Sequence, residues 1–506
     1  MFGETFSREE LSALADGEGA GSDVLARLVS NELLMLGARG KLDQEYQFRH
    51  GLLRDAAYAM LEDDDRRALH LAAAELLARR GDAEALVTAE HFERGGAPHR
   101  AVEFFRIAAE QALNTLNLDH AGAIAQRGLA CGAAGAERGS LLVVQANIAF
   151  IRGDPCTSLP LSKEAFALLP RESSAFFPAA AFTLAAGALV GDMELAPQVI
   201  EAILTAEPLT PTGYFGSAVG QAAEILEGIG QYEAAEQLLC SAEARATEDA
   251  PASFRAHVAY ARAGRQVAAD DGLGTILAAV SPGLELAESS GDPLASVLFN
   301  FGAGVSYAEV GAFDLARRCL GRFEGQFSRA VIFHAWRAIH LGWCDVLQGS
   351  FAEARAHADR AMADPRHALA LHAYAALHEG DLRDARRAID QALEGIERTH
   401  VTPFVVALGN AIAAAIARAE GRLETARSLA ARAAEHTRGP PSARSLIDRV
   451  HLEILLATGE DVSAVLSRAA ARIERHRRSL PAEFARSYVA LPDNARILAL
   501  AGGARY

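Results

Sequence analysis

The stretch GSFAEARAHADRAM, residues 349–362, decides the predicted fold because its first six residues recur along the chain. Their order is glycine, a small or polar residue, an apolar residue, two mostly polar residues and alanine. Neighbouring glycines are mostly 38 or 39 residues apart (349 − 311 = 38; 230 − 191 = 39), and the longer gap between 230 and 311 holds two units, one without its glycine. Recurrence at this period is typical of helical solenoids. The other copies are GDPCTS at 153–158, GDMELA at 191–196, GQYEAA at 230–235, GAFDLA at 311–316, GDLRDA at 380–385, GRLETA at 421–426 and GEDVSA at 459–464.

Each copy predicts a helical hairpin. Glycine readily adopts the left-handed conformation that ends a helix, so the first helix stops there. The polar residues then begin a second helix, whose apolar residue and alanine lie three apart and face the first helix. Asp292 before Pro293 adds a helix start, because aspartate caps free backbone N–H groups and proline fits the first helical position. We expect about ten or eleven stacked hairpins.

Composition agrees with an all-helical chain and excludes several functions. Half of the 506 residues are apolar but only 7% are aromatic, and the frequent alanine favours helix. The net charge of −16 argues against a primary role in binding nucleic acid. The only two lysines are Lys41 and Lys163, and neither lies in a P-loop or a kinase motif. No motif for catalysis, metal or cofactor is found, so we expect a non-enzymatic protein that needs no cofactor.

Two further features concern location and surface. The five cysteines are scattered and odd in number, which indicates buried thiols in a reducing compartment. The first residues do not form a signal peptide, and together these features predict a cytoplasmic protein. The basic run at residues 472–478 is interpreted as a solvated helix face.

The repeated phrase resembles the tetratricopeptide family, whose motif positions are matched by Gly342, Gly349, Phe351, Ala354 and Ala361 in one unit. The period is nearer 38–39 than the family's 34, so the helices are expected to be longer. The resemblance implies an all-α, right-handed superhelical solenoid over residues 67–506.

The first 66 residues differ from the repeats. Ser7 and Glu10 form a capping box, a helix begins near Ser22, and residues 33–36 and 46–48 flank a charged turn, which predicts a β-hairpin. A helix follows from about Gly51. This order of elements indicates a small winged-helix-like cap.

The phrase YQFRHGLLRDAAY, residues 46–58, resembles the end of the ATPase module of bacterial signalling proteins linked to a Ser/Thr kinase or an adenylate cyclase. The resemblance implies that the kinase or cyclase and the ATPase parts would precede Met1, and that this chain is a truncated or separate C-terminal part. The candidate ATPase-contact motif is Phe48, Arg49, His50, Arg54, Asp55 and Tyr58. The alternative is that these residues hold the cap to the first repeat.

A partner-binding groove is predicted around the only two tryptophans, Trp336 and Trp343. They lie seven residues apart and therefore on one helix face. Aromatic residues dominate the binding energy of interfaces, which favours a groove here. The alternative is that the same side chains fill the interior. The candidate groove residues are Leu298, Phe301, Trp336, Trp343, His367, Tyr374 and His378.

We therefore expect a sensor region that binds a protein or peptide partner, with an upstream or separate ATPase or kinase as one candidate partner. A DNA-linked regulator with inducer-sensing repeats is the alternative. Acidic Asp43 and Glu45 interrupt the cations Arg39, Lys41 and Arg49 near the wing, so contact with nucleic acid is not favoured.

Overall fold

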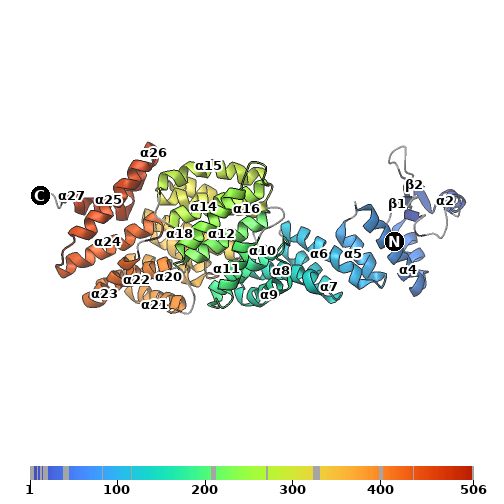
Figure 1. Cartoon of the computed structure of the whole chain (residues 1–506), viewed down its shortest axis with the longest axis horizontal. Coiled ribbons are helices and arrows are strands. Elements are labelled where there is room, and N and C mark those ends of the chain that lie inside the picture. The colour runs from blue at the N-terminus through green and yellow to red at the C-terminus, as the bar shows by residue number, and fades with distance from the viewer. Residues whose placement is uncertain are drawn as a thin grey trace. The chain divides into compact units, whose positions relative to one another are not determined.

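A computed structural model describes residues 5–7, 10–11, 14, 21–37, 45–81, 84–115, 117–206, 212–228, 230–268, 272–322, 331–397, 403–436 and 438–503. The chain divides into two compact units, Met1–Gln145 and Ala146–Tyr506, which we call unit 1 and unit 2. Figure 1 labels most of their helices. Apart from one small sheet in unit 1, the regular structure of the described residues is helical, as the sequence predicts.

The elements that begin in unit 1 are β1 (Thr5–Ser7), α2 (Gly21–Ser30), β2 (Leu34–Leu36), β3 (Glu45–Phe48), α3 (Gly51–Ala59), α4 (Asp63–Arg80), α5 (Ala85–Arg94), α6 (Pro98–Asn114), α7 (Leu118–Ala130) and α8 (Gly135–Ile151). Those of unit 2 are α9 (Pro155–Leu168), α10 (Phe176–Val190), α11 (Ala196–Thr205), α12 (Gly213–Gly228), α13 (Tyr232–Arg245), α14 (Ala252–Ala268), α15 (Leu273–Ser289), α16 (Pro293–Glu309), α17 (Phe313–Gly321), α18 (Val331–Gln348), α19 (Phe351–Arg360), α20 (Pro365–His378), α21 (Leu382–Glu397), α22 (Pro403–Ala419), α23 (Leu423–Glu435), α24 (Pro441–Thr458), α25 (Ser463–Ser479), α26 (Ala482–Ala490) and α27 (Pro492–Gly503).

The N-terminal part of unit 1 contains the predicted hairpin. Strands β2 and β3 pair antiparallel with Leu34 opposite Phe48, while the predicted turn at 38–44 lies outside the described residues. Strand β1, which the sequence did not predict, pairs with the other edge of β3. The Ser7 Oγ accepts from the Glu10 N–H while the Ser7 N–H donates to the Glu10 carboxylate, so the predicted capping box forms. The winged-helix assignment and the boundary at residue 66 stay predictions.

The glycine of each copy lies between two helices in the left-handed conformation. Gly349, with φ +80°, separates α18 from α19, and Gly421, with φ +78°, separates α22 from α23. The glycines at 153, 191, 230, 311, 380 and 459 have φ between +73° and +87°. The unit without a marker is the pair α14–α15, whose turn uses Gly272, at φ +66°, directly before α15. The predicted helical-hairpin solenoid is confirmed.

The hairpins of unit 2 form two layers. The first helices, α10, α12, α14, α16, α18, α20, α22 and α24, each contact the next one in the series. The second helices, from α11 to α23, instead contact the first helix of the following hairpin. In a curved double layer the inner layer covers the shorter arc, so its helices approach each other most closely. The first helices therefore form the inner layer of unit 2, and we call their exposed side the inner surface.

Unit 2 is wound tightly enough for its C-terminal helices to pack on its middle. The Glu309 carboxylate of α16 accepts hydrogen bonds from the Ser442 backbone N–H at 2.7 Å and hydroxyl at 2.8 Å, at the start of α24. The Ser487 hydroxyl donates to the Val310 carbonyl at 2.6 Å. A Cβ at Gly274 of α15 would lie 2.0 Å from the Ser479 carbonyl oxygen, so glycine is needed there. This closure was not predicted.

Two predictions of surface position are wrong. Arg472 and His476, in the run interpreted as solvated, are 8% and 1% exposed, and Arg472 donates to Ser445 and Asp448 of α24. These two residues are four apart and share the helix face that packs on α24. Conversely, only Cys344 of the five cysteines is buried, whereas Cys156 and Cys240 are exposed.

Candidate interaction surface

The aromatic residues predicted for the groove meet on the inner layer. Phe301 of α16 lies 6.4 Å from Trp336 of α18 between ring centroids and 4.8 Å from His340, one turn along α18. Phe333 packs edge-on to Trp336 at 5.5 Å. Phe301, Trp336 and His340 are only partly buried, whereas Phe333 is buried. We call Phe301, Phe333, Trp336 and His340 the inner aromatic cluster. Partly exposed aromatic rings on a concave layer offer a partner large contact area.

The second predicted tryptophan belongs to a different group of rings. Trp343 lies 5.9 Å from Tyr374 of α20, which in turn contacts His378 at 4.6 Å, and His378 stacks on Phe351 of α19. Tyr374 is 4% exposed and its hydroxyl accepts from Arg449 of α24 at 3.0 Å. Burial raises the pKa of Tyr374 above its usual range. This group packs α18, α20 and α24 together, while His378 itself is exposed.

The remaining two predicted groove residues flank the inner aromatic cluster. Leu298 lies on α16 and is half-buried. His367 lies in the first turn of α20, with its Nδ1 2.8 Å from the buried Asp364 carboxylate and a third of its side chain exposed. Although burial opposes ionisation of Asp364, His367 and Arg366 hold the pKa of that carboxyl well below its usual range.

Sequence reasoning missed two residues of the inner layer, Glu224 of α12 and Tyr260 of α14. Partial loss of hydration raises the pKa of the Glu224 carboxyl, and His367 lies close enough to oppose that rise. Its side chain nevertheless remains exposed, as expected for a residue at a concave surface. The position of Glu224 on its helix could have indicated this placement. Glu224 lies one turn beyond Gly220, where an added Cβ would touch Ala261 of α14, so both residues share the helix face near α14.

The ATPase-contact motif lies in unit 1, around the sheet and α3. Phe48 packs on Phe6 in the core formed by Leu25, Leu34 and Tyr46. Arg49 forms an ion pair with Glu32 at 3.0 Å, so one of the three cations considered for contact with DNA is already paired. The other two, Arg39 and Lys41, lie outside the described residues.

The second half of the motif connects α3 to the first repeat. His50 precedes α3 without capping it through its side chain, and Arg54 pairs with the adjacent Asp55 at 2.6 Å. The Tyr58 hydroxyl lies 2.9 Å from Nε2 of His70 on α4. Tyr58 and His70 therefore join α3 to α4.

His70 continues into a buried histidine pair. Its Nδ1 lies 2.8 Å from Nδ1 of His91 on α5, so one ring donates to the other. If the Tyr58 hydroxyl donates to His70, then His70 donates to His91 and both rings are neutral. Burial lowers the pKa of each to about 4, with a further contribution from Arg94.

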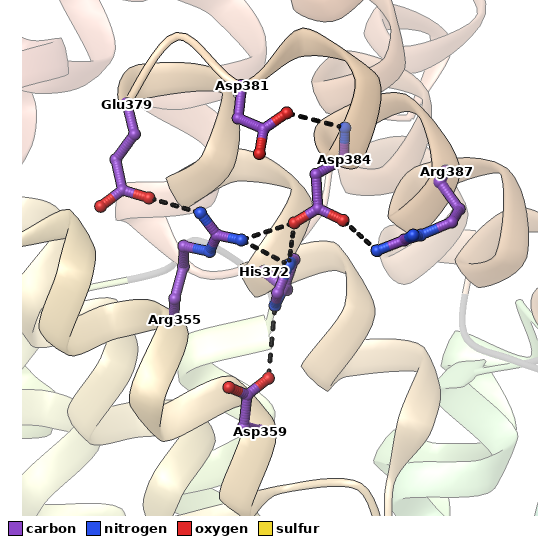
Figure 2. A network of polar contacts seen from close by, with 7 residues as sticks. All are labelled: Arg355, Asp359, His372, Glu379, Asp381, Asp384 and Arg387. Atoms are coloured by element: carbon purple, nitrogen blue, oxygen red, sulfur yellow. Dashed lines mark hydrogen bonds and ion pairs between the residues drawn. The ribbon is translucent and has the colours of Figure 1, made fainter.

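A separate polar network joins three helices of unit 2 (Figure 2). The Asp384 carboxylate of α21 accepts from His372 of α20 at 2.7 Å and from Arg355 of α19 at 2.5 Å. Arg355 also donates to Glu379 at 2.8 Å. The hydrogen bond from His372 is the main cause that lowers the pKa of Asp384. Because these groups satisfy each other, we interpret the network as structural.

Two kinds of site are absent from the described residues. Nowhere among them are three or more His, Cys, Asp or Glu side chains arranged to hold a metal ion. In the same part of the chain, no helix has the length and apolar character required to cross a membrane.

The fold and the inner surface define a tetratricopeptide-like helical repeat chain. The sequence matches no protein-family profile and no curated protein. Three of the solved structures to which this chain is similar each cover most of it. The APC/C Cut9–Hcn1 structure has 13% identity, covering 88% of this chain and 98% of that one, with a TM-score of 0.34. A signal transduction ATPase with numerous domains and a tetratricopeptide repeat sensor, from Pyrococcus horikoshii, has 13% identity over 92% of this chain and 62% of that one, with a TM-score of 0.35. The structure of yeast Tom70 has 10% sequence identity, covering 88% of this chain and 96% of that one, with a TM-score of 0.31.

Proposed function

We propose that unit 2 binds a protein or peptide partner on its inner surface and that the chain is a non-enzymatic sensor region. The observation that carries this proposal is the inner aromatic cluster. Phe301, Trp336 and His340 come from adjacent first helices and remain partly exposed, whereas most apolar side chains of these helices are buried. Rings left accessible on the concave layer supply apolar contact area at a low cost in side-chain entropy.

A random peptide library displayed on phage and selected on the immobilised full chain tests this proposal. We expect selected peptides to bind with micromolar affinity and to change the fluorescence of Trp336 and Trp343, the only tryptophans. Because central aromatic residues contribute about 2 kcal/mol or more, Trp336→Ala weakens binding by about 30-fold.

The matched control is Leu204→Ala, which removes an exposed apolar side chain from the outer helix α11 and leaves binding unchanged. Circular dichroism of the Trp336→Ala variant separates binding from folding. A large loss of helicity in this variant, or binding that withstands the replacement, contradicts the proposal.

We further propose that this sensor region serves a signalling ATPase linked to a Ser/Thr kinase or a cyclase. The support is the resemblance of residues 46–58 to the end of such ATPase modules. In this proposal, partner binding favours one of two states of the repeats and so changes the contact with the ATPase, which requires different partner affinity in the two states.

The test mixes the chain with ATPase modules encoded in the same genome and measures complex formation and ATP hydrolysis. We expect a complex with one of these modules and a change in its hydrolysis rate that Arg49→Ala abolishes. No complex with any of the modules, or hydrolysis that is the same with the wild-type chain and with Arg49→Ala, contradicts this assignment.

A further inference from the structure

We propose that the inner surface recognises its peptide partner through a lysine or arginine side chain, which binds Glu224 beside the rings of Tyr260, Phe301 and His340. This inference rests on the proposed function, because it names the chemistry of the partner that the same surface accepts.

The first step is the state of Glu224. Among the described residues, the exposed side chain of Glu224 neither accepts a hydrogen bond nor forms an ion pair. Glu227, one turn further along α12, differs because Arg265 of α14 pairs with it at 2.6 Å. An exposed carboxylate without a partner in its own chain is available to a cation of a bound peptide, and a charge-assisted hydrogen bond between them is stronger than a neutral one.

The second step is the surroundings of Glu224. Gly220, one turn before Glu224 on α12, packs against Ala261, the neighbour of Tyr260 on α14. The Tyr260 ring in turn packs on Gly302, where an added Cβ would lie 3.0 Å from its Cε2. Phe301, the neighbour of Gly302 on α16, contacts His340 at 4.8 Å. These contacts place the carboxylate and the rings in one region of the inner surface. His367 acts to lower the pKa of both Glu224 and His340, as expected of that placement.

The third step is the sign of the charge that this region accepts. Burial lowers the pKa of His340 to about 4, so its ring is neutral at pH 7 and does not repel a cation. His367 and Arg366 face the same region, but both are paired with the Asp364 carboxylate. Glu224 is therefore the carboxylate of this region that has no ion pair among the described residues, and aromatic faces favour a cation further.

The experiment uses peptides selected on the full chain as described above. We expect lysine or arginine at one fixed position of the selected sequences. Replacing that residue by norleucine weakens binding to the wild-type chain by about tenfold or more, measured by tryptophan fluorescence. In Glu224→Gln the same replacement has little effect, because the charge that the cation pairs with is gone.

The matched control is Glu285→Gln, which neutralises an exposed glutamate on α15. In this variant the norleucine replacement still costs about tenfold in affinity. Selected peptides that bind through the inner surface but lack a fixed cation, or that lose as much affinity in Glu224→Gln as in wild type, overturn this inference and leave the proposed function standing. A selection that yields no binding peptides overturns both.

Discussion

Replacement of Glu309 by alanine is expected to loosen the C-terminal helices of unit 2 without unfolding its middle. Helix α24 begins at Pro441, after Pro440, and neither residue supplies a side-chain cap. Glu309 of α16, 133 residues earlier, accepts from both the N–H and the hydroxyl of Ser442 and is 6% exposed. It therefore caps α24 from another helix, with a negative charge at the positive end of the helix dipole.

The expected magnitude follows from those contacts. A hydrogen bond to a charged group contributes about 1.5–3 kcal/mol, and loss of a helix cap costs about 1 kcal/mol. Because both effects concern the same atoms, we expect about 2–3 kcal/mol for Glu309→Ala. Amide hydrogen exchange of α24 and α25 should then accelerate by about 30- to 100-fold, because each 1.4 kcal/mol is a factor of ten.

The assay compares exchange in α24–α25 with exchange in α10–α12. Glu285→Gln, an exposed change on α15, is the matched control and is expected to alter neither region. Ser442→Ala, which removes the hydroxyl but keeps the backbone N–H, should give an intermediate acceleration in α24. Unchanged exchange of α24 in Glu309→Ala would refute the capping argument.

Three further outcomes are expected. Gly349→Ala should lower the thermal stability by about 1–2 kcal/mol because its φ is +80°, whereas Gly264→Ala within α14 should raise it; equal effects of the two variants count against the left-handed turn. Unit 1 should lose stability as the pH falls from 6.5 to 4, because the unfolded chain binds protons on His70 and His91 in that window while the folded pair does not. At about 1.4 kcal/mol per pKa unit, the loss amounts to a few kcal/mol. Exchange protection of α4 and α5 that is the same at pH 7 and pH 5 contradicts this expectation. Asp384→Asn should destabilise α20–α21 by about 1.5–3 kcal/mol, measured by chemical denaturation, with Asp390→Asn on the exposed side of α21 as the neutral control.

The turns of unit 2 were predictable because each depends on residues next to one another in sequence. Glycine at positive φ ends one helix and the polar residues after it begin the next, so Gly349 and Gly421 lie where the repeated phrase puts them. Asp292 is a further local signal, and its carboxylate accepts from the N–H groups of Leu294 and Ala295 as expected of an N-cap.

The winding of the repeats and the details of the inner surface were not predictable, because they depend on residues far apart in the chain. Glu309 and Ser442 do not belong to the repeated phrase, and nothing local indicates that they meet. Glu224 lies on α12 and His367 on α20, so their proximity follows only from the curvature. The burial of Arg472 could have been predicted from the sequence, because it is four residues from His476 and both therefore lie on one helix face.

The claim that unit 2 binds its partner on the inner layer is tested most directly by hydrogen exchange of the full chain with and without a selected peptide. We expect protection on α16, α18 and α20, at the segments that hold Phe301, Trp336 and His367. Protection confined to the outer helices α17, α19 and α21, or to unit 1, would contradict the claim.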